Sequence, residues 1–206
     1  MTRPLPMFPL NTVLFPGVGL PLHVFEPRYR LLTRHCLDSD RRFGVVLIER
    51  GSEVGGGDVR SSVGTVARIL EGTELPDGRW LLMVVGVERL EVERWLADDP
   101  YPRAVVRPLT DPPAGYEAAD HRVEVERLLR RVLALKAELG DPAPPATVEL
   151  DLDPVVAAYQ AAALAGLGPF DGQRLLELPT TDQRLDALAR LLAEAADVLA
   201  QRAGGG

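Results

Sequence analysis

Prolines at positions 6, 9, 16 and 21 interrupt an otherwise apolar N-terminal stretch, residues 5–30, and constrain the fold more than any other feature. Each proline lacks an amide hydrogen and biases the preceding residue toward extended backbone, so a continuous helix is excluded here. Pro16-Gly17 favours a sharp turn. The stretch therefore predicts short strands joined by turns.

One short helix and further strands are predicted after the opening strands. Pro27 suits the first turn of a helix, and apolar residues three and four positions apart carry that helix to about Leu37. The segment FGVVLIE at 43–49 is rich in β-branched residues and is typical of a strand buried on both faces. The remaining strands are expected at 63–71, 80–85, 90–95 and 104–109, and Asp77-Gly78 marks a hairpin turn between the first two.

The strands predicted for the N-terminal half, about six or seven of them, are separated by turns and not by helices. That spacing favours a small barrel or folded-over sheet over a doubly wound fold. After residues 111–113 the apolar period changes to that of helices, which are expected at about 125–139, 154–164, 171–178 and from Thr180 onward. Residues 1–112 and 113–203 are thus predicted as two domains, and 204–206 as a disordered tail.

Two apolar stripes in the C-terminal half, one before residue 140 and one after Thr180, could also support a coiled coil. Each stripe lasts only about two or three heptads, which is short for a coiled coil. We therefore interpret these stripes as faces that pack within the chain, and the sequence sets no oligomeric state.

The charge pattern bears on possible partners. The net charge is −7, but residues 1–110 carry 14 basic and 14 acidic side chains, so the acidic excess lies in the remainder. A polyanion partner normally requires clustered Lys and Arg, so nucleic acid is not expected. The single cysteine, Cys36, forms no internal disulfide, and we expect it to be a buried structural residue. With no signal-peptide pattern or long apolar run, we expect a cytoplasmic protein without a membrane partner.

Sequence motifs for catalysis are not found. The only lysine, Lys136, precedes alanine, so the Walker phosphate-binding pattern is missing. No serine stands in a G-x-S-x-G context. The available metal ligands do not have the spacing of a zinc site; they are His23, His35, Cys36, Asp38 and His121. We therefore expect no enzyme activity, no metal and no cofactor.

Taken together, the motifs of residues 5–110 resemble the N-terminal substrate-binding domain of the Lon family of ATP-dependent proteases. The resemblance rests on LPMFPLNTVLFPGVGLPLHVFEPRYR, FGVVLIE, VGTVARILE, LPDGR, VVGVERLEVE and YPRAVV, which follow one another in the order and spacing of the family. Residues 115–200 are similar, more loosely, to the helical subdomain that follows. Arg89-Leu90 departs from the Phe or Arg-Phe that is frequent in the family, a conservative change in the core.

The resemblance implies an α+β protein, with a PUA-like β-barrel that contains an inserted short helix and is followed by a helical bundle. It also implies recognition of polypeptides. The ATPase and peptidase modules of Lon are not in this sequence, so we expect a non-catalytic adaptor that binds unfolded or degron-bearing polypeptides. A cooperating protease is a second expected partner.

A hydrophobic groove beside the segment FEPRYR is the expected binding site. We predict contacts from Phe15, Phe25 and Tyr29 and polar anchoring by Glu26 and Arg28. The alternative for the aromatic residues is packing in the core, and for the charged pair an ion pair that fixes the corner between strand and helix. Two other functions stay open, namely RNA binding by the PUA-like domain and binding of a small molecule between barrel and helices.

Overall fold

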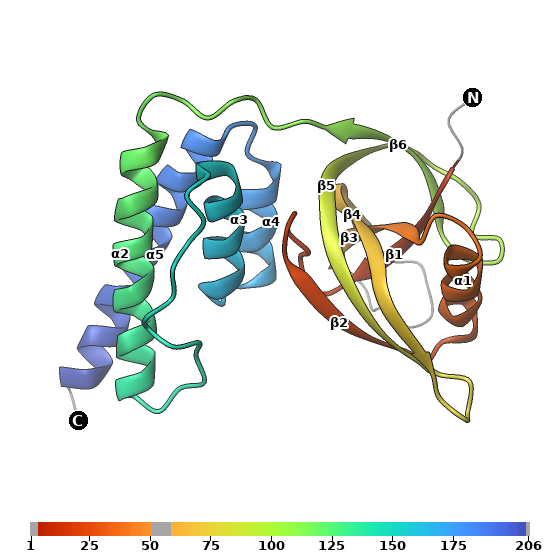
Figure 1. Ribbon diagram of the computed structural model, residues 1–206, viewed down its shortest axis with the longest axis horizontal. Coiled ribbons are helices and arrows are strands. Elements are labelled where there is room, and N and C mark those ends of the chain that lie inside the picture. Colours follow the sequence, from red (N-terminus) through yellow and green to blue (C-terminus); the bar gives the residue numbers. More distant parts are fainter. Residues whose placement is uncertain (1–3, 51–58, 205–206) are drawn as a thin grey trace. The chain divides into compact units, whose positions relative to one another are not determined.

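The computed structural model describes residues 4–50 and 59–204. It divides the chain into two compact units, Met1–Thr110 and Asp111–Gly206. The first unit contains all the described strands and helix α1, and the second contains helices α2–α5, so the fold is of the mixed α+β type (Figure 1). Of the predicted disordered tail, Gly204 belongs to the last turn of α5, and residues 205–206 lie outside the described part.

Six strands form one sheet in the first unit, in the order β2-β5-β4-β3-β1-β6. Strand β6 pairs antiparallel with β1 and also with β5, so β5, β4, β3, β1 and β6 form a closed cycle of neighbours, and β2 pairs with β5 outside that cycle. Strands β1 and β3 run parallel, and the other pairs run antiparallel. Their bounds are β1 Leu5–Leu10, β2 Gly19–Val24, β3 Arg42–Arg50, β4 Val59–Glu74, β5 Trp80–Trp95 and β6 Arg103–Leu109.

Strands β4 and β5 are longer than the sequence predicted. Strand β5 runs without a break through the region where two strands were expected, and β4 begins before and ends after its predicted range. Two shifts of register in their pairing, after Val66 and after Ile69, mark β-bulges. A bulge bends and twists a strand, so β4 and β5 remain paired while the sheet curves around the core.

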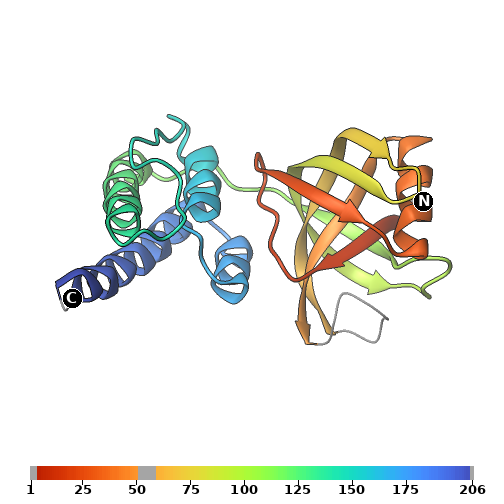
Figure 2. The ribbon, with the colours of Figure 1, turned by 90° about the horizontal axis from the view of Figure 1, so that it is seen from below.

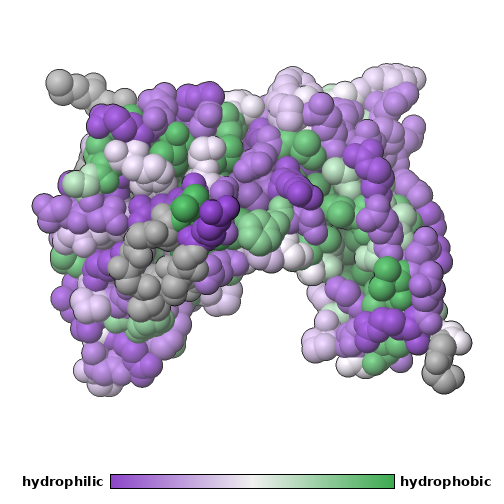
Figure 3. All heavy atoms as spheres, turned by 180° about the vertical axis from the view of Figure 1, so that it is seen from behind, coloured by the Kyte–Doolittle hydropathy of each residue, from purple (hydrophilic) through white to green (hydrophobic). Residues whose placement is uncertain are grey.

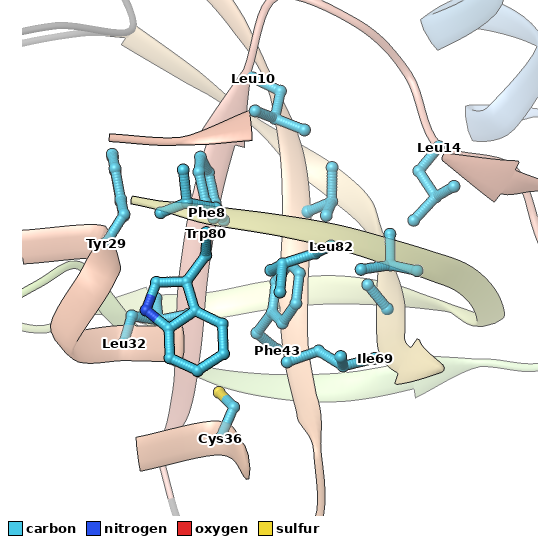
Figure 4. Packing of buried hydrophobic residues seen from close by; sticks show 14 of the residues in the cluster. Phe8, Leu10, Leu14, Tyr29, Leu32, Cys36, Phe43, Ile69, Trp80 and Leu82 are labelled. Carbon is cyan, nitrogen blue, oxygen red and sulfur yellow. The ribbon is translucent and has the colours of Figure 1, made fainter. Parts of the chain in front are cut away.

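Helix α1, Pro27–Leu37, begins and ends as the sequence predicted. Its buried face packs on the core of the first unit, where the Phe8 ring of β1 stacks on the Tyr29 ring with centroids 4.1 Å apart. Figure 4 shows Trp80 and Leu32 beside this pair. Cys36 is buried, as predicted, and its thiol donates a hydrogen bond to the Arg42 carbonyl.

The second unit consists of α2 Ala118–Glu138, α3 Pro154–Leu164, α4 Pro169–Glu177 and α5 Thr181–Gly204. Helices α2 and α5 pack along each other, and α3 contacts both (Figure 2). The predicted N-cap of α3 is confirmed, because the Asp153 carboxylate accepts a hydrogen bond from the Val155 amide at 2.9 Å. Thr180 likewise accepts one from the Gln183 amide. No helix within residues 4–50 and 59–204 has the length and hydrophobicity to span a membrane.

Candidate functional site

An apolar pocket of about 210 Å³ lies between β1, β2 and the start of α1. The C-terminal end of β1, with Phe8 and Leu10, supplies one wall, and β2 supplies the other. Phe25 and Glu26, at the corner between β2 and α1, close one end. Its lining residues are Phe8, Leu10, Thr12, Leu20, Pro21, Leu22, His23, Val24, Phe25, Glu26 and Tyr29. Most of this surface is hydrophobic, so the pocket suits uncharged, apolar groups.

The wall formed by β2 follows from the alternation of its sequence. Leu20, Leu22 and Val24 are more buried than their neighbours, and they pack against the core cluster of the first unit or belong to it. The residues between them are exposed. Because successive side chains of a strand point to opposite faces, this alternation places apolar side chains along one side of the pocket.

The opposite wall and the floor are formed by aromatic side chains. Phe8 and Tyr29 are almost completely buried, and their stacked rings hold β1 against the first turn of α1. Pro27 starts the helix without requiring a backbone donor, so Tyr29 lies on the first turn, facing the core. This part of the pocket is rigid because both rings are fixed by packing.

Phe25 lies where β2 ends and α1 begins, and 51% of its surface is exposed. Its ring is tilted against the imidazole of His23, with centroids 6.0 Å apart. A large aromatic side chain that is half exposed beside an apolar pocket is available for contact with a partner.

The charged groups near the pocket are compensated in place. The Arg28 guanidinium donates from Nε to Glu26 Oε2 at 3.1 Å, and it lies 4.5 Å above the Tyr29 ring. Further along α1, Arg34 pairs with Glu74. Arg28 and Arg34 thus carry local partners, and Glu26, the carboxylate in the pocket lining, is neutralised by Arg28.

The structure brings three of the five predicted site residues together. Phe25, Glu26 and Tyr29 line the pocket. Arg28 is not part of the lining and acts on it through Glu26. Phe15 is buried and stands outside the lining, and its carbonyl lies close to Gly86 of β5.

Sequence reasoning did not identify the walls of the pocket. The residues it missed are Phe8, Leu10, Leu20 and Leu22. The alternation of Leu20, Leu22 and Val24 with exposed residues was a usable signal for the second wall. Strand β1 gives no comparable signal, because Met7 to Leu10 are all buried.

The described residues that line the pocket include no serine, cysteine or lysine, and the polar side chains among them are Thr12, His23, Glu26 and the Tyr29 phenol. Elsewhere in residues 4–50 and 59–204, no group of three or more His, Cys, Asp or Glu side chains could hold a metal ion. The chemistry that this arrangement offers is the burial of apolar side chains.

Comparison with protein families gives a match over residues 4–194 to the ATP-dependent protease La (LON) substrate-binding domain. Among curated proteins, the chain is 32% identical over 210 residues to Lon protease 2 of Herpetosiphon aurantiacus. The aligned region covers 96% of this chain and 24% of that relative. It is 30% identical over 198 residues to Lon protease of Phenylobacterium zucineum, again covering 24% of the relative. The chain thus spans about a quarter of the length of these relatives.

Two solved structures share the fold. One is the Lon N-terminal domain protein from Xanthomonas campestris, with a TM-score of 0.66, 28% identity, and coverage of 93% of this chain and 98% of that one. The other is the N-terminal domain of the Mycobacterium avium complex Lon protease, with a TM-score of 0.69 over 95% of this chain and 98% of that one. Its identity is 20%, and so this second similarity concerns the fold alone.

Proposed function

This chain belongs to the family of ATP-dependent protease La (LON) substrate-binding domains, and on that premise we propose that it binds unfolded or degron-bearing polypeptides without catalysing a reaction itself. The observation that carries the proposal is the apolar pocket with the half-exposed Phe25 at its edge. An unfolded polypeptide exposes apolar side chains that a folded protein buries, and such a pocket recognises that difference.

The size and charge of the pocket favour a polypeptide over the two alternatives. At about 210 Å³ the pocket is smaller than the roughly 300–1,000 Å³ typical of small-molecule sites, and suits single side chains of a longer ligand. RNA binding requires clustered basic residues, whereas residues 1–110 carry equal numbers of basic and acidic side chains, and Arg28 and Arg34 of α1 are paired with Glu26 and Glu74.

The proposal includes a specific reading of the fold. We interpret the closed cycle of strands with α1 as a PUA-like β-barrel, and α2–α5 as a helical bundle, each forming one domain of the chain. We assign binding to the barrel and place the protein in the cytoplasm, where it would act as an adaptor in protein quality control together with a protease.

Binding of a permanently unfolded protein tests the proposal directly. We would measure the fluorescence anisotropy of labelled α-lactalbumin, reduced and carboxymethylated so that it cannot refold, as the chain is titrated into it. Complete burial of a Phe side chain contributes about 1.5–3 kcal/mol. Since half of Phe25 is still exposed, Phe25→Ser should weaken binding by about four- to thirteenfold.

The matched control is Val198→Ser, which removes an apolar side chain of similar exposure, 58%, from α5. This variant should bind the unfolded protein as the unaltered chain does. Equal loss of binding in both variants, or no binding of the unfolded protein by the unaltered chain, would contradict the proposal.

A further inference from the structure

Strand β2 has an unpaired edge. Within residues 4–50 and 59–204 its only strand partner is β5. The Gly86 amide donates to the Val18 carbonyl at 3.0 Å, so Val18 and Gly86 occupy a hydrogen-bonding position next to the first pair of the ladder, although the Val18 amide itself donates to the Phe15 carbonyl. Such positions alternate along an antiparallel ladder.

The alternation decides which main-chain groups of β2 point away from β5. Leu20, Leu22 and Val24 fall in hydrogen-bonded positions, so their amides and carbonyls are directed at β5. The residues between them, Gly19, Pro21 and His23, direct theirs to the open edge. Pro21 has no amide hydrogen, and an edge position is where a sheet tolerates proline. The open edge therefore offers two amides and three carbonyls, all from those three residues.

The C-terminal part of β1 borders the other side of the pocket. Strand β6 pairs with β1 only at its N-terminal residues Leu5 and Pro6. The Met7 amide donates to the Pro102 carbonyl at 2.8 Å, on the side of β1 away from β3. The main chain of Pro9, two residues later, is directed to the same side, but proline has no amide hydrogen to donate. This side of β1 is poor in donors, and β2 is the better edge for main-chain pairing.

The open edge of β2 is held in place by the loop that precedes it. The Thr65 hydroxyl donates to the Leu14 carbonyl at 2.6 Å, and the Gly17 amide donates to the Gly86 carbonyl at 2.9 Å. These bonds fix the loop on β4 and β5. The edge is therefore already ordered before a ligand binds, and binding loses little further conformational entropy there.

From this geometry we propose that an extended, apolar segment of an unfolded polypeptide adds to the open edge of β2 as a further strand. Its main chain pairs with Gly19, Pro21 and His23, and alternate apolar side chains enter the pocket beside Leu20 and Leu22. The inference rests on the proposed function and specifies how the polypeptide is held. Strand addition supplies affinity through main-chain bonds and selectivity through alternate side chains.

The edge itself selects this occupant. Only a chain in extended conformation presents main-chain donors and acceptors at the spacing of a strand. The ion pair of Glu26 with Arg28 leaves no charge for an ionic ligand to neutralise. A second copy of this chain is a poorer partner, because pairing β2 with β2 would bring two edges that each lack the amide at Pro21 into contact.

A gain of binding provides the sharpest test. Pro21→Ala creates a third amide donor on the open edge, and one added hydrogen bond should tighten binding of carboxymethylated α-lactalbumin by about two- to tenfold. Pro76→Ala, in the exposed turn between β4 and β5, is the matched control and should bind as the unaltered chain does. Because a misfolded variant would expose apolar surface that also binds an unfolded protein, a gain counts only if circular dichroism shows that Pro21→Ala is folded as the unaltered chain is.

A second measurement uses a short acetylated peptide in which leucine alternates with serine. Two versions of this peptide are compared, one methylated on the backbone nitrogen of every serine and the other on that of every leucine. N-methylation removes the amide donor of the residue that carries it. Only alternate residues of an added strand face β2, so the two versions should lose affinity unequally. The serine version should lose more if the peptide runs antiparallel to β2.

The outcomes separate the two proposals. If the unfolded protein binds, but Pro21→Ala gives no gain and both methylated peptides bind equally, strand addition is wrong and the proposed function stands. If the unfolded protein does not bind at all, the proposed function is wrong as well. If Pro21→Ala drives dimerisation without a gain in affinity for the unfolded protein, the occupant of the edge is a second copy, which also overturns the inference.

Discussion

The buried arginine of the helical unit gives a stability prediction that can be worked out from its contacts. Arg184 is completely buried, and its Nη2 donates to Asp111 Oδ1 at 3.1 Å and to the Leu178 carbonyl at 2.9 Å. Its Nε donates to the Leu175 carbonyl at 3.1 Å, and its guanidinium lies 4.4 Å from the centre of the Tyr159 ring. One side chain thus joins the start of the unit, Asp111, to α3 and to the end of α4.

The substitution Arg184→Met keeps an unbranched apolar stem but removes the guanidinium and with it all of these donors. Removing one partner of a buried ion pair costs about 3–5 kcal/mol. Asp111 is 16% exposed and keeps the hydrogen bond from the Tyr159 hydroxyl, at 2.6 Å. We therefore expect a loss of about 3 kcal/mol in the free energy of unfolding, at the lower end of that range.

Urea denaturation measures this loss for each unit separately. Both tryptophans, Trp80 and Trp95, belong to residues 1–110, so their fluorescence reports on the first unit. Helical circular dichroism reports mainly on the second. Arg184→Met should move the dichroism transition to lower urea and leave the fluorescence transition in place.

The matched control is Arg190→Met, which alters an exposed arginine of the same helix and should change stability by less than about 0.5 kcal/mol. A loss of less than about 1 kcal/mol for Arg184→Met would refute the assignment of Arg184 as the residue that holds the second unit together. Equal effects of the two substitutions would refute it too.

Two further predictions concern the first unit. In Gly86→Ala the new Cβ would lie 2.2 Å from the Phe15 carbonyl oxygen, so the loop before β2 must move, and the fluorescence transition should lose about 1–3 kcal/mol; an unchanged transition would contradict this close approach. The Arg79 backbone amide donates to Asp77 and holds the pKa of its carboxyl below the ordinary value. Because the folded pKa is depressed, the turn gains stability above the pKa of the unfolded chain and loses it as pH falls through the folded pKa. NMR titration should thus give Asp77 a lower midpoint in the folded chain than in urea, and equal midpoints would refute the contact.

Local signals in the sequence were sufficient for the starts of α1 and α3, whereas α2 begins at Ala118, before its predicted range of about 125–139. The start of α3 is set by Asp153, whose carboxylate accepts from the Val155 amide two residues later, and by Pro154 at the first helical position. The start of α1 is set by Pro27, also at the first helical position. Elements of this kind depend on neighbours along the chain, so the sequence alone predicts them.

Long-range contacts decided what the sequence could not predict. Gly86 resembles a break between two strands, but it lies within β5 because the chain around Phe15 packs closely against it. The fold buries Phe15, while Phe25 at the end of β2 is left half exposed. Both phenylalanines follow a branched apolar residue, and only the fold distinguishes them.

Hydrogen–deuterium exchange of the chain, with and without bound carboxymethylated α-lactalbumin, tests the central claim most directly. If the polypeptide occupies the pocket and the open edge, exchange should slow in residues 19–29, at the amides of Gly19 and His23 above all, since those two face away from β5. Residues 169–194 of the helical unit serve as the internal reference and should be unaffected. Slower exchange in the helical unit alone, with residues 19–29 unchanged, would contradict the account.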